Sequence, residues 1–401
     1  YEITYGDWSS DVCSSDLPKF PNSPTLNLPL LQSQRGLILV GPTHPGDSLA
    51  AAETIATLGR ILGYPVLSDA LNPLRNLGLD CTLMTTYEFI LRNAADRQHL
   101  TPDVVIQIGE LPTSKTLRQW LVTLDPPRYI LSGAQPDNLD PLHGQSIHLR
   151  CTLESFLQEV QAQVNPLPRD SAAPVSGGLS TYAQAWQARE QHHRHHLQQL
   201  FANLTDLREP KVAWLLAQCL PPQTLLFVAN STPIRDMEWF WLPQTPTGIQ
   251  PFCNRGANGI DGTLSTALGL VHDSDRPGVL LTGDLSLLHD TNGFLQRSSF
   301  RGSLTIVLIN NQGGGIFELL PIADFDPPFE TFFATPQGID FAPLCHTYGI
   351  EHHLITTWQQ LERLVQTLPD RGIRVLEIRS DRRGDAAWRK ALWATAASSM
   401  S

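Results

Sequence analysis

The stretch LLTGDLSLLHDTNGFLQRSSFRGSLTIVLINNQGGGIFELLP (residues 280–321) contains two apolar runs that each end in polar residues. Residues 278–282 and 304–309 are short, apolar and rich in β-branched side chains, which predicts two buried strands. The dipeptide Gly-Asp at 283–284 follows the first strand, and Asn-Asn at 310–311 follows the second. The residues between them are sufficient for one helix and a return strand. Both strand ends are therefore expected at one edge of a parallel sheet, where α/β proteins bind ligands.

Three oxygen donors are expected to meet at that edge. Asp284 offers a carboxylate, Asn311 an amide oxygen and Gly313 a backbone carbonyl. Mg²⁺, or Mn²⁺ in its place, prefers such hard oxygen ligands and completes its coordination with phosphate oxygens and water. The glycine run 313–315 allows a sharp turn and a close backbone approach, and the residues after Asp284 lead into a helix whose first amides suit phosphate. The sequence therefore predicts a site for a cation and a phosphate group.

Outward from this stretch, apolar runs alternate with segments of helical periodicity. Strands are predicted at 36–40, 65–68, 103–108, 128–131, 146–149, 224–229, 278–282, 304–309, 352–355 and 374–378. Helices are predicted at 47–62, 113–121, 182–203, 262–270, 291–298 and 358–367, with Thr113 or Ser114 as the N-cap of the second. Strands that alternate with helices indicate an α/β fold with two doubly wound, mostly parallel sheets.

The domain boundaries follow from shifts in composition. Residues 164–180 are rich in Pro, Ser, Gly and Ala, which is typical of a linker, and a polar helix follows. The chain starts with Tyr rather than Met, and its first residues are Ser/Asp-rich without periodicity. We predict a non-native or disordered leader at 1–26, a central α/β domain at 27–165, a linker and connecting helix at 166–204, a second α/β domain at 205–390 and a tail at 391–401.

Composition argues against several classes of protein. With 41% hydrophobic and 17% charged residues, the chain can bury a sizeable core. A net charge of −11 provides no basic field for nucleic acid. No apolar run approaches the roughly 20 residues that a membrane-spanning helix needs. The six cysteines are scattered without a Cys-x-x-Cys pair, which argues against a disulfide framework or structural zinc and favours a cytoplasmic protein.

The Gly-Asp and Asn-Asn pairs at this spacing form the thiamine diphosphate motif. Together with NRGANGIDGTLSTALG (254–269), the flanking sequence resembles the 2-succinyl-5-enolpyruvyl-6-hydroxy-3-cyclohexene-1-carboxylate synthases of menaquinone and phylloquinone biosynthesis. The resemblance covers roughly residues 30–390 and is most specific between 225 and 321. Leu285 stands where most thiamine diphosphate enzymes have the third glycine of the motif, and this departure matches the synthase family.

The resemblance implies a three-domain enzyme of which this chain holds two domains. Residues 27–165 would form most of the central domain and residues 205–390 the diphosphate-binding domain. The pyrimidine-binding domain, which carries the glutamate that activates the cofactor, has no counterpart here. No catalytic residue is therefore assigned, and the chain alone is expected to be inactive. The full-length enzyme is expected to be a cytoplasmic homodimer or homotetramer.

The family's residue roles transfer to matching positions. Metal ligands would be Asp284, Asn311 and the Gly313 carbonyl. The cofactor would contact Gly283, Asp284, Leu285, Ser286, Asn311 and Gly313, with Ile260 wedged between its two rings. Substrate would contact Arg35, Ser231, Arg235, Arg255, Ile316, Phe317 and Leu320. Gln34 replaces the basic neighbour usual beside Arg35. The structural alternatives are an ordinary core position for Ile260 and surface or ion-pair roles for the arginines.

The family reaction is the decarboxylation of 2-oxoglutarate followed by 1,4-addition of the resulting carbanion to isochorismate. Both substrates are dicarboxylates, so an acidic protein must concentrate guanidinium groups where they bind. One alternative is a thiamine diphosphate-dependent carboligase or decarboxylase for another 2-oxo acid, similar to acetolactate synthase, which would not need paired arginines. Another is a fragment that binds Mg²⁺ and thiamine diphosphate weakly or not at all.

Overall fold

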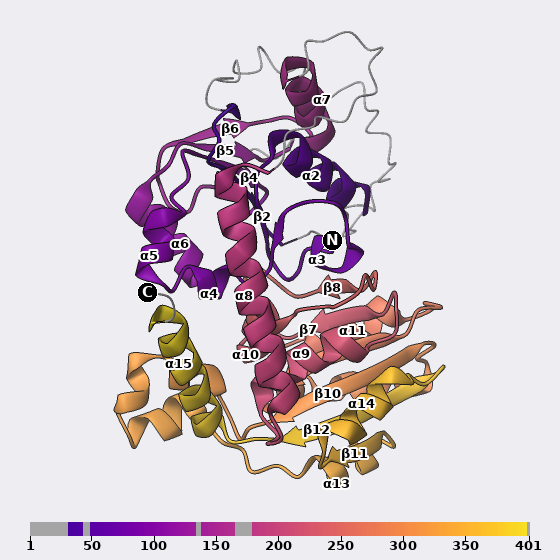
Figure 1. The fold of residues 1–401 in the computed structure, drawn as a ribbon. Coiled ribbons are helices and arrows are strands. Elements are labelled where there is room, and N and C mark those ends of the chain that lie inside the picture. The colour runs from indigo at the N-terminus through magenta and orange to yellow at the C-terminus, as the bar shows by residue number, and fades with distance from the viewer. Residues whose placement is uncertain (1–30, 43–48, 134–137, 165–178, 399–401) are drawn as a thin grey trace, which may run out of the picture.

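The computed structural model of this chain describes residues 31–42, 49–133, 138–164 and 179–398. Two six-stranded parallel sheets lie in two units of the chain, and one long helix runs beside both of them (Figure 1). The expected leader and residues 165–178 of the expected linker lie outside the described residues. None of the described helices is both long enough and apolar enough to cross a membrane.

The first sheet has the strand order β3-β2-β1-β4-β5-β6, and all its pairs are parallel. Its strands are β1 (Gly36–Val40), β2 (Val66–Ser68), β3 (Leu83–Met84), β4 (Val104–Ile108), β5 (Arg128–Leu131) and β6 (Ser146–Leu149). The chain moves outward from β1 on one side and then returns to continue from β4 on the other. This reversal is characteristic of a doubly wound sheet and confirms the predicted fold class.

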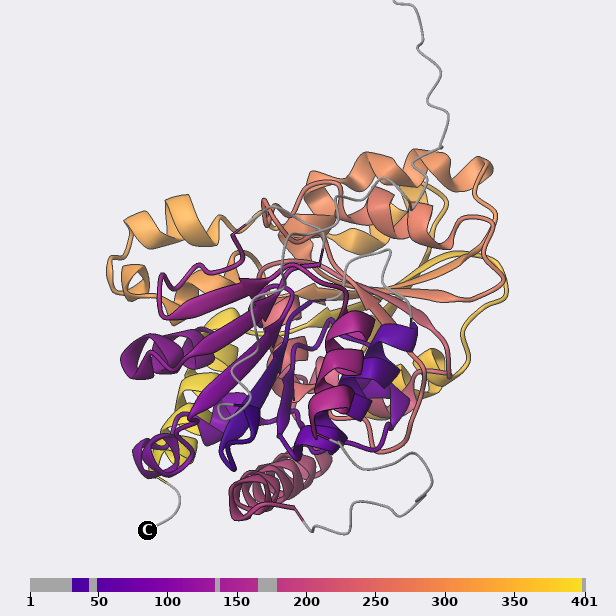
Figure 2. The ribbon, with the colours of Figure 1, turned by 90° about the horizontal axis from the view of Figure 1, so that it is seen from above.

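Helices cover both faces of the first sheet because successive strand side chains point to opposite faces. One face packs on α2 (Leu49–Leu62), α3 (Leu74–Leu77) and α7 (Leu153–Val164). The other packs on α4 (Tyr87–Ile90), α6 (Lys115–Leu124) and the start of α8 (Thr181–Asn203), with α5 (Ala94–His99) nearby. These two layers can be followed in the view from above (Figure 2). Ser114 caps α6 by accepting a hydrogen bond from the Leu117 N–H at 3.0 Å, as predicted.

The second sheet has the order β11-β12-β10-β9-β7-β8 and is also entirely parallel. Its strands are β7 (Leu225–Val228), β8 (Gln250–Phe252), β9 (Gly278–Gly283), β10 (Ser303–Asn310), β11 (Glu351–Ile355) and β12 (Gly372–Arg379). The winding direction reverses between β7 and β9. A crevice for ligands is expected outside the carboxyl ends of these strands.

Helices again cover both faces of the second sheet. One face packs on α9 (Glu209–Cys219), α10 (Thr232–Phe240) and α14 (Trp358–Gln366). The other packs on α11 (Thr263–Val271), α12 (Asp284–His289), α13 (Phe341–Thr347) and the 3₁₀ helix η1 (Thr291–Ser298). Short helical turns η2 (Gly315–Leu319), η3 (Pro321–Asp324) and η4 (Glu330–Ala334) follow β10, and α15 (Arg382–Ser398) ends the described chain. The residues expected as a tail are thus helical as far as Ser398.

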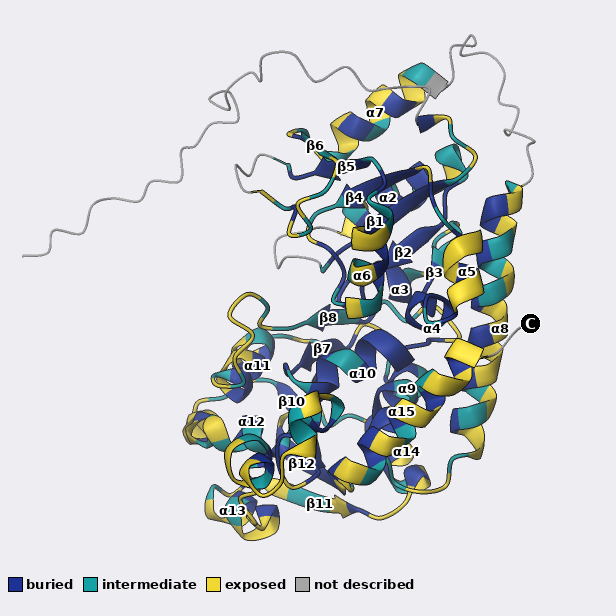
Figure 3. Cartoon of the chain, turned by 90° about the vertical axis from the view of Figure 1, so that its left-hand side faces the viewer, coloured by how far each residue is buried: buried dark blue, intermediate teal, exposed yellow. Residues whose placement is uncertain are grey.

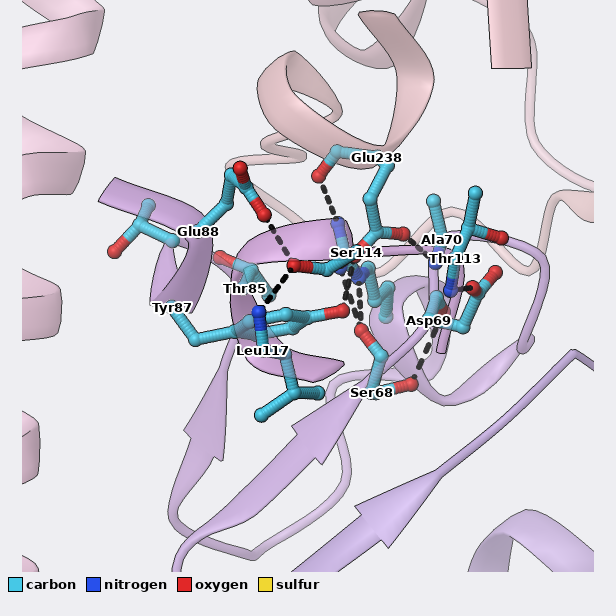
Figure 4. A network of polar contacts seen from close by, with 12 residues as sticks. Ser68, Asp69, Ala70, Thr85, Tyr87, Glu88, Thr113, Ser114, Leu117 and Glu238 are labelled. Atoms are coloured by element: carbon cyan, nitrogen blue, oxygen red, sulfur yellow. Dashed lines mark hydrogen bonds and ion pairs between the residues drawn. The ribbon is translucent and has the colours of Figure 1, made fainter. Parts of the chain in front are cut away.

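The two units are joined by a buried polar network (Figure 4). Glu238 of α10 accepts hydrogen bonds from the Ala70 N–H at 2.7 Å and from Arg75 Nη2 at 2.8 Å, and the Tyr87 hydroxyl also donates to it. Burial raises the pKa of Glu238 to about 8, whereas the charge of Arg75 opposes this shift. Because the three donors belong to the first unit and Glu238 to the second, the network fixes α10 against the first sheet.

Helix α8 is more buried than its polar sequence predicts. One stripe of its side chains is buried, namely Tyr182, Trp186, Glu190, His193, Leu197 and Phe201. Its opposite side is exposed, as the burial colouring shows (Figure 3). The Glu190 carboxylate accepts hydrogen bonds from the N–H groups of Thr85 and Thr86 at 3.1 and 2.9 Å. The connecting helix therefore packs closely along both units.

Candidate functional site

A pocket of about 380 Å³ opens at the carboxyl ends of β7, β9 and β10, at the reversal of the second sheet. Its lining consists of Glu209, Asn230, Ser231, Thr232, Pro233, Arg235, Arg255, Asn258, Gly259, Ile260, Gly283, Asp284, Leu285, Ser286, Asn311, Gly313, Gly314, Gly315, Ile316 and Phe317. Twelve of the fourteen residues predicted for cofactor, metal or substrate are among them. The pocket combines oxygen donors, glycines, two arginines and an apolar wall.

The two halves of the motif are adjacent because β9 and β10 are neighbours in register, with Gly283 paired to Ile309. The Gly313 N–H donates to Asp284 Oδ2 at 2.8 Å. Burial raises the pKa of Asp284 to about 6, and hydrogen bonds from backbone N–H groups oppose this shift. A divalent cation beside this carboxylate would favour its ionised form.

Asn311 shows that the donor set fits a hard cation. Its Oδ1 is buried and has no hydrogen-bond partner, although its Nδ2 donates to Glu209 Oε2 at 3.4 Å. A buried acceptor without a partner is costly unless a ligand satisfies it. Within the described ranges no three His, Cys, Asp or Glu side chains form a metal cluster. A cation here would therefore rely on one carboxylate, one amide and backbone oxygens, as Mg²⁺ sites with phosphate ligands do.

The glycine run after Asn311 is required sterically. Gly313 has φ +129°, and a Cβ on it would lie 2.2 Å from the Ala334 carbonyl oxygen. A Cβ on Gly315 would lie 2.6 Å from Asn311 Nδ2. Any side chain at these positions would displace either the neighbouring backbone or the amide of Asn311.

Ile260 is half-buried and lines the pocket opposite the glycine run. Its carbonyl oxygen accepts hydrogen bonds from the hydroxyls of Thr263 and Ser286, both at 2.9 Å. The Ser286 hydroxyl is thus used inside the protein, where it ties the Ile260 loop to the start of α12. This contact leaves the backbone of residues 285 and 286 as the groups that can serve a phosphate.

Two arginines lie on the side of the pocket formed by α10 and the β8–α11 loop. Arg235 Nη1 donates to the Ser231 carbonyl at 2.7 Å, and Arg255 Nη1 donates to Asn230 Oδ1 at 2.7 Å. Burial and then the charge of Arg255 lower the pKa of Arg235. Like charges held close together in a partly buried pocket favour an anionic ligand, which relieves their repulsion.

The structure does not bring two predicted residues to the pocket. Arg35 lies just before β1, at the amino edge of the first sheet, where it donates to the carbonyls of His99 and Thr101 and lies over the Tyr182 ring. Leu320 follows η2 and is 44% exposed, outside the pocket lining. Ile316 and Phe317 do line the pocket, and Phe317 packs edge-on against Phe333.

Sequence reasoning missed several residues that the fold places here. Glu209 comes from the start of α9, far from the motif in sequence. Asn230 holds the β8–α11 loop, because its Nδ2 donates to the carbonyls of Asn254 and Gly259 at 2.7 and 2.8 Å. Burial, and then the charge of Arg255, lower the pKa of Arg118 on α6, which is outside the pocket lining. Only Asn230 gave a local signal, as a polar residue directly after a predicted strand.

The fold and this site are typical of α/β proteins that bind a phosphorylated ligand at the carboxyl ends of parallel strands. A family model described as "Middle domain of thiamine pyrophosphate" matches residues 18–228, and the chain belongs to this family.

Its relatives are 2-succinyl-5-enolpyruvyl-6-hydroxy-3-cyclohexene-1-carboxylate synthases. The chain is 53% identical over 368 residues to that of Synechococcus elongatus, which covers 92% of the chain and 60% of the relative. It is 49% identical over 370 residues to that of Rippkaea orientalis, covering 92% and 61%, and 48% identical over 379 residues to that of Trichormus variabilis, covering 94% and 63%. The chain thus spans about three fifths of the length of these relatives.

Proposed function

We propose that this chain is part of a thiamine diphosphate-dependent transferase that decarboxylates 2-oxoglutarate and adds the resulting four-carbon carbanion to isochorismate by 1,4-addition. The product would be the compound after which its relatives are named. The observation that carries the proposal is the pocket itself, in which an oxygen-only donor set and two arginines face one space. The donor set suits the cation of a diphosphate cofactor, and the arginines suit the carboxylates of a 2-oxo dicarboxylate.

The proposed cofactor site uses the ends of β9 and β10. Asp284, Asn311 and the Gly313 carbonyl would hold Mg²⁺ or Mn²⁺, and the backbone at 283–286 would bind the diphosphate. When bound, thiamine diphosphate supplies a nucleophilic carbon and an electron sink for 2-oxo acids. Ile260 would support the bent cofactor, because Ser286 and Thr263 anchor its carbonyl beside the diphosphate loop.

The proposed substrate site uses Arg235 and Arg255 as carboxylate clamps, with the Ser231 hydroxyl nearby. The Nη1 of each guanidinium donates one hydrogen bond to the protein, and the remaining N–H donors can bind a ligand. Ile316 and Phe317 would form the apolar wall beside the reacting carbon and exclude water from it. Arg35 and Leu320 have no role in this proposal.

Replacing Arg235 with Ala in the full-length protein tests the substrate assignment. We expect kcat/KM for a dicarboxylate substrate to fall about ten- to more than a hundredfold, which corresponds to a lost charged hydrogen bond of roughly 1.5–3 kcal/mol. Arg301→Ala is the matched control, because Arg301 pairs with Asp273 on the exposed surface. Unchanged kinetics for both 2-oxoglutarate and isochorismate would refute the assignment. A preference for pyruvate would instead favour the acetolactate synthase-like alternative.

We also propose that the full-length protein is a cytoplasmic homodimer or homotetramer. Phe325 and Phe332 are 62% and 74% exposed in the segment that follows the pocket. Large exposed aromatic side chains near a site are typical of a surface that another domain or subunit covers. Light scattering coupled to size exclusion would measure the mass of the full-length protein, and a monomer would contradict this proposal.

A further inference from the structure

Glu209 touches the candidate metal site without belonging to its donor set. It is the first residue of α9, only 2% exposed, and it lines the pocket. Its Oε2 accepts a hydrogen bond from Asn311 Nδ2 at 3.4 Å. The same oxygen lies 3.1 Å from Arg389 Nη2. One carboxylate oxygen is thus shared by a proposed metal ligand and by a buried guanidinium from the C-terminal helix.

Arg389 is itself held rigidly. Its Nε donates to Asp236 Oδ1 at 2.8 Å and its Nη2 also contacts Asp236 Oδ2, so the two side chains form a bidentate pair. Arg389 is 1% exposed and Asp236 2%. The Glu209 N–H donates to Asp385 Oδ2 at 3.2 Å, which anchors the backbone of Glu209 to α15 as well. Both ends of Glu209 are therefore fixed by α15.

This arrangement decides which way the amide of Asn311 faces. A carboxylate has only acceptors, so Glu209 can contact the Nδ2 of Asn311 but not its Oδ1. Oδ1 consequently faces away from Glu209, and it is the buried atom that has no partner in the protein. The missing Cβ of Gly315 provides the space in which Nδ2 lies. In the described ranges, the hydrogen bond to Glu209 is the contact that distinguishes Nδ2 of this amide from Oδ1.

We propose that Glu209 is a positioning residue, held by Arg389, that orients Asn311 so that Oδ1 rather than Nδ2 faces the cation. This inference rests on the metal site of the proposed function. Asp236 extends the same network to α10, whose neighbouring residue Arg235 lies in the substrate clamp. Helix α15 thereby couples the cation side of the pocket to its arginine side.

The test is a Mg²⁺ titration of the full-length protein, with thiamine diphosphate at saturation and no substrate. Tryptophan fluorescence reports Mg²⁺ binding. Removing a group that orients a metal ligand typically weakens metal affinity about 10- to 100-fold, and we expect this loss for Glu209→Ala. Glu209→Gln should stay within about threefold of wild type, because a Gln carbonyl in the position of Oε2 accepts from both Asn311 and Arg389.

Two further variants keep the result interpretable. Glu209→Asp retains the buried charge but withdraws the acceptor from Asn311, so it should fold and still lose affinity. Asp140→Ala is the matched control, since Asp140 pairs with Arg128 at 2.5 Å and both are buried in the first unit. It should lower the melting temperature and leave the Mg²⁺ affinity unchanged.

Asp284→Ala separates the possible failures. If Asp284→Ala binds Mg²⁺ as wild type does, the proposed metal site is wrong. If Asp284→Ala loses Mg²⁺ while Glu209→Ala or Glu209→Asp binds it normally, only the role of Glu209 is overturned. Loss in both of these Glu209 variants together with retention in Glu209→Gln supports the proposal.

Discussion

At the scale of single residues, three of the eight non-glycine residues with positive φ in the described ranges lie at or beside the pocket. Ser231 and Asn258 line it with φ values of +73° and +57°, and Gln312, with φ +61°, stands between Asn311 and Gly313. Non-glycine residues in such conformations cost roughly 1–3 kcal/mol each and persist where the surroundings enforce them. Here the surroundings are the loops that present oxygen donors and arginines, so the strain lies where the site must be shaped.

The glycine at 313 provides a test at this scale. We expect Gly313→Ala to destabilise the protein by roughly 1–3 kcal/mol more than Gly63→Ala, because its Cβ would overlap the Ala334 carbonyl. Gly63 also has a positive φ, +67°, with open space around its Cβ position, so its substitution reports the cost of a positive φ without a steric overlap. Urea unfolding monitored by circular dichroism gives both free energies. Equal losses would show that the loop relaxes around the added methyl group.

At the scale of elements, two helices carry more buried charge than a surface helix should. Helix α15 contributes Arg389 and Asp385, and α8 contributes Glu190, all of them buried. Each charged group meets partners from a distant segment, as Arg389 does with Asp236. Breaking such a buried pair costs about 3–5 kcal/mol. These helices are therefore tied to their places by specific contacts as well as by apolar packing.

His193 of α8 makes the free energy of unfolding of the protein depend on pH. Burial, and next the charge of His192, lower its pKa to about 4, so the folded state keeps it neutral. The unfolded chain binds this proton near pH 6.5, which means that stability is full above that pH and is lost as pH falls towards 4. We expect His193→Leu to remove about 2 kcal/mol of the difference in unfolding free energy between pH 7.5 and pH 5. His195→Leu, at an exposed position of the same helix, should leave the dependence unchanged in urea titrations at pH 7.5 and 5, because His195 is not among the groups that shift the pKa of His193.

At the scale of the whole molecule, the two units act as one support for the pocket. The contacts of Glu238 with Arg75, Tyr87 and the Ala70 N–H hold α10, and α10 carries Arg235. The contacts of α15 with Glu209 and Asp236 hold the other side. The first sheet therefore contributes to the site mainly by fixing an element of the second.

The chain by itself is expected to be inactive. The chain spans about three fifths of the length of its relatives, and the family resemblance leads us to expect the activating glutamate outside these residues. General acid–base groups contribute about 10²–10⁴-fold to rate. We expect the 401 residues, with Mg²⁺ and thiamine diphosphate, to release CO₂ from 2-oxoglutarate at least about a hundredfold more slowly than the full-length protein. Comparable turnover would place the activating group within this chain.

The sequence by itself determined ten strands and their parallel arrangement, whereas the short strands β3 and β8 were not predicted. β1, β5 and β6 have the predicted bounds, because short apolar and β-branched runs between polar turns are a local signal. Asp284 and Asn311 were also predictable together, since parallel strands bring their carboxyl ends to one edge.

Tertiary structure alone decided what depends on distant partners. Helices α10 and α15 contain Asp, Glu and Arg residues whose polarity predicts exposure, yet they are buried. Their burial can be predicted only when the positions of their partners Arg75, Glu209 and Arg389 are known. Arg35 lies at the amino ends of the strands of the first sheet. The residues around it in the sequence do not indicate how these strand ends are placed relative to the pocket. Glu209 reaches Asn311 across 102 positions of the chain. Local residues specify an element and its ends, whereas the pairing of buried charges is set only when separate elements pack.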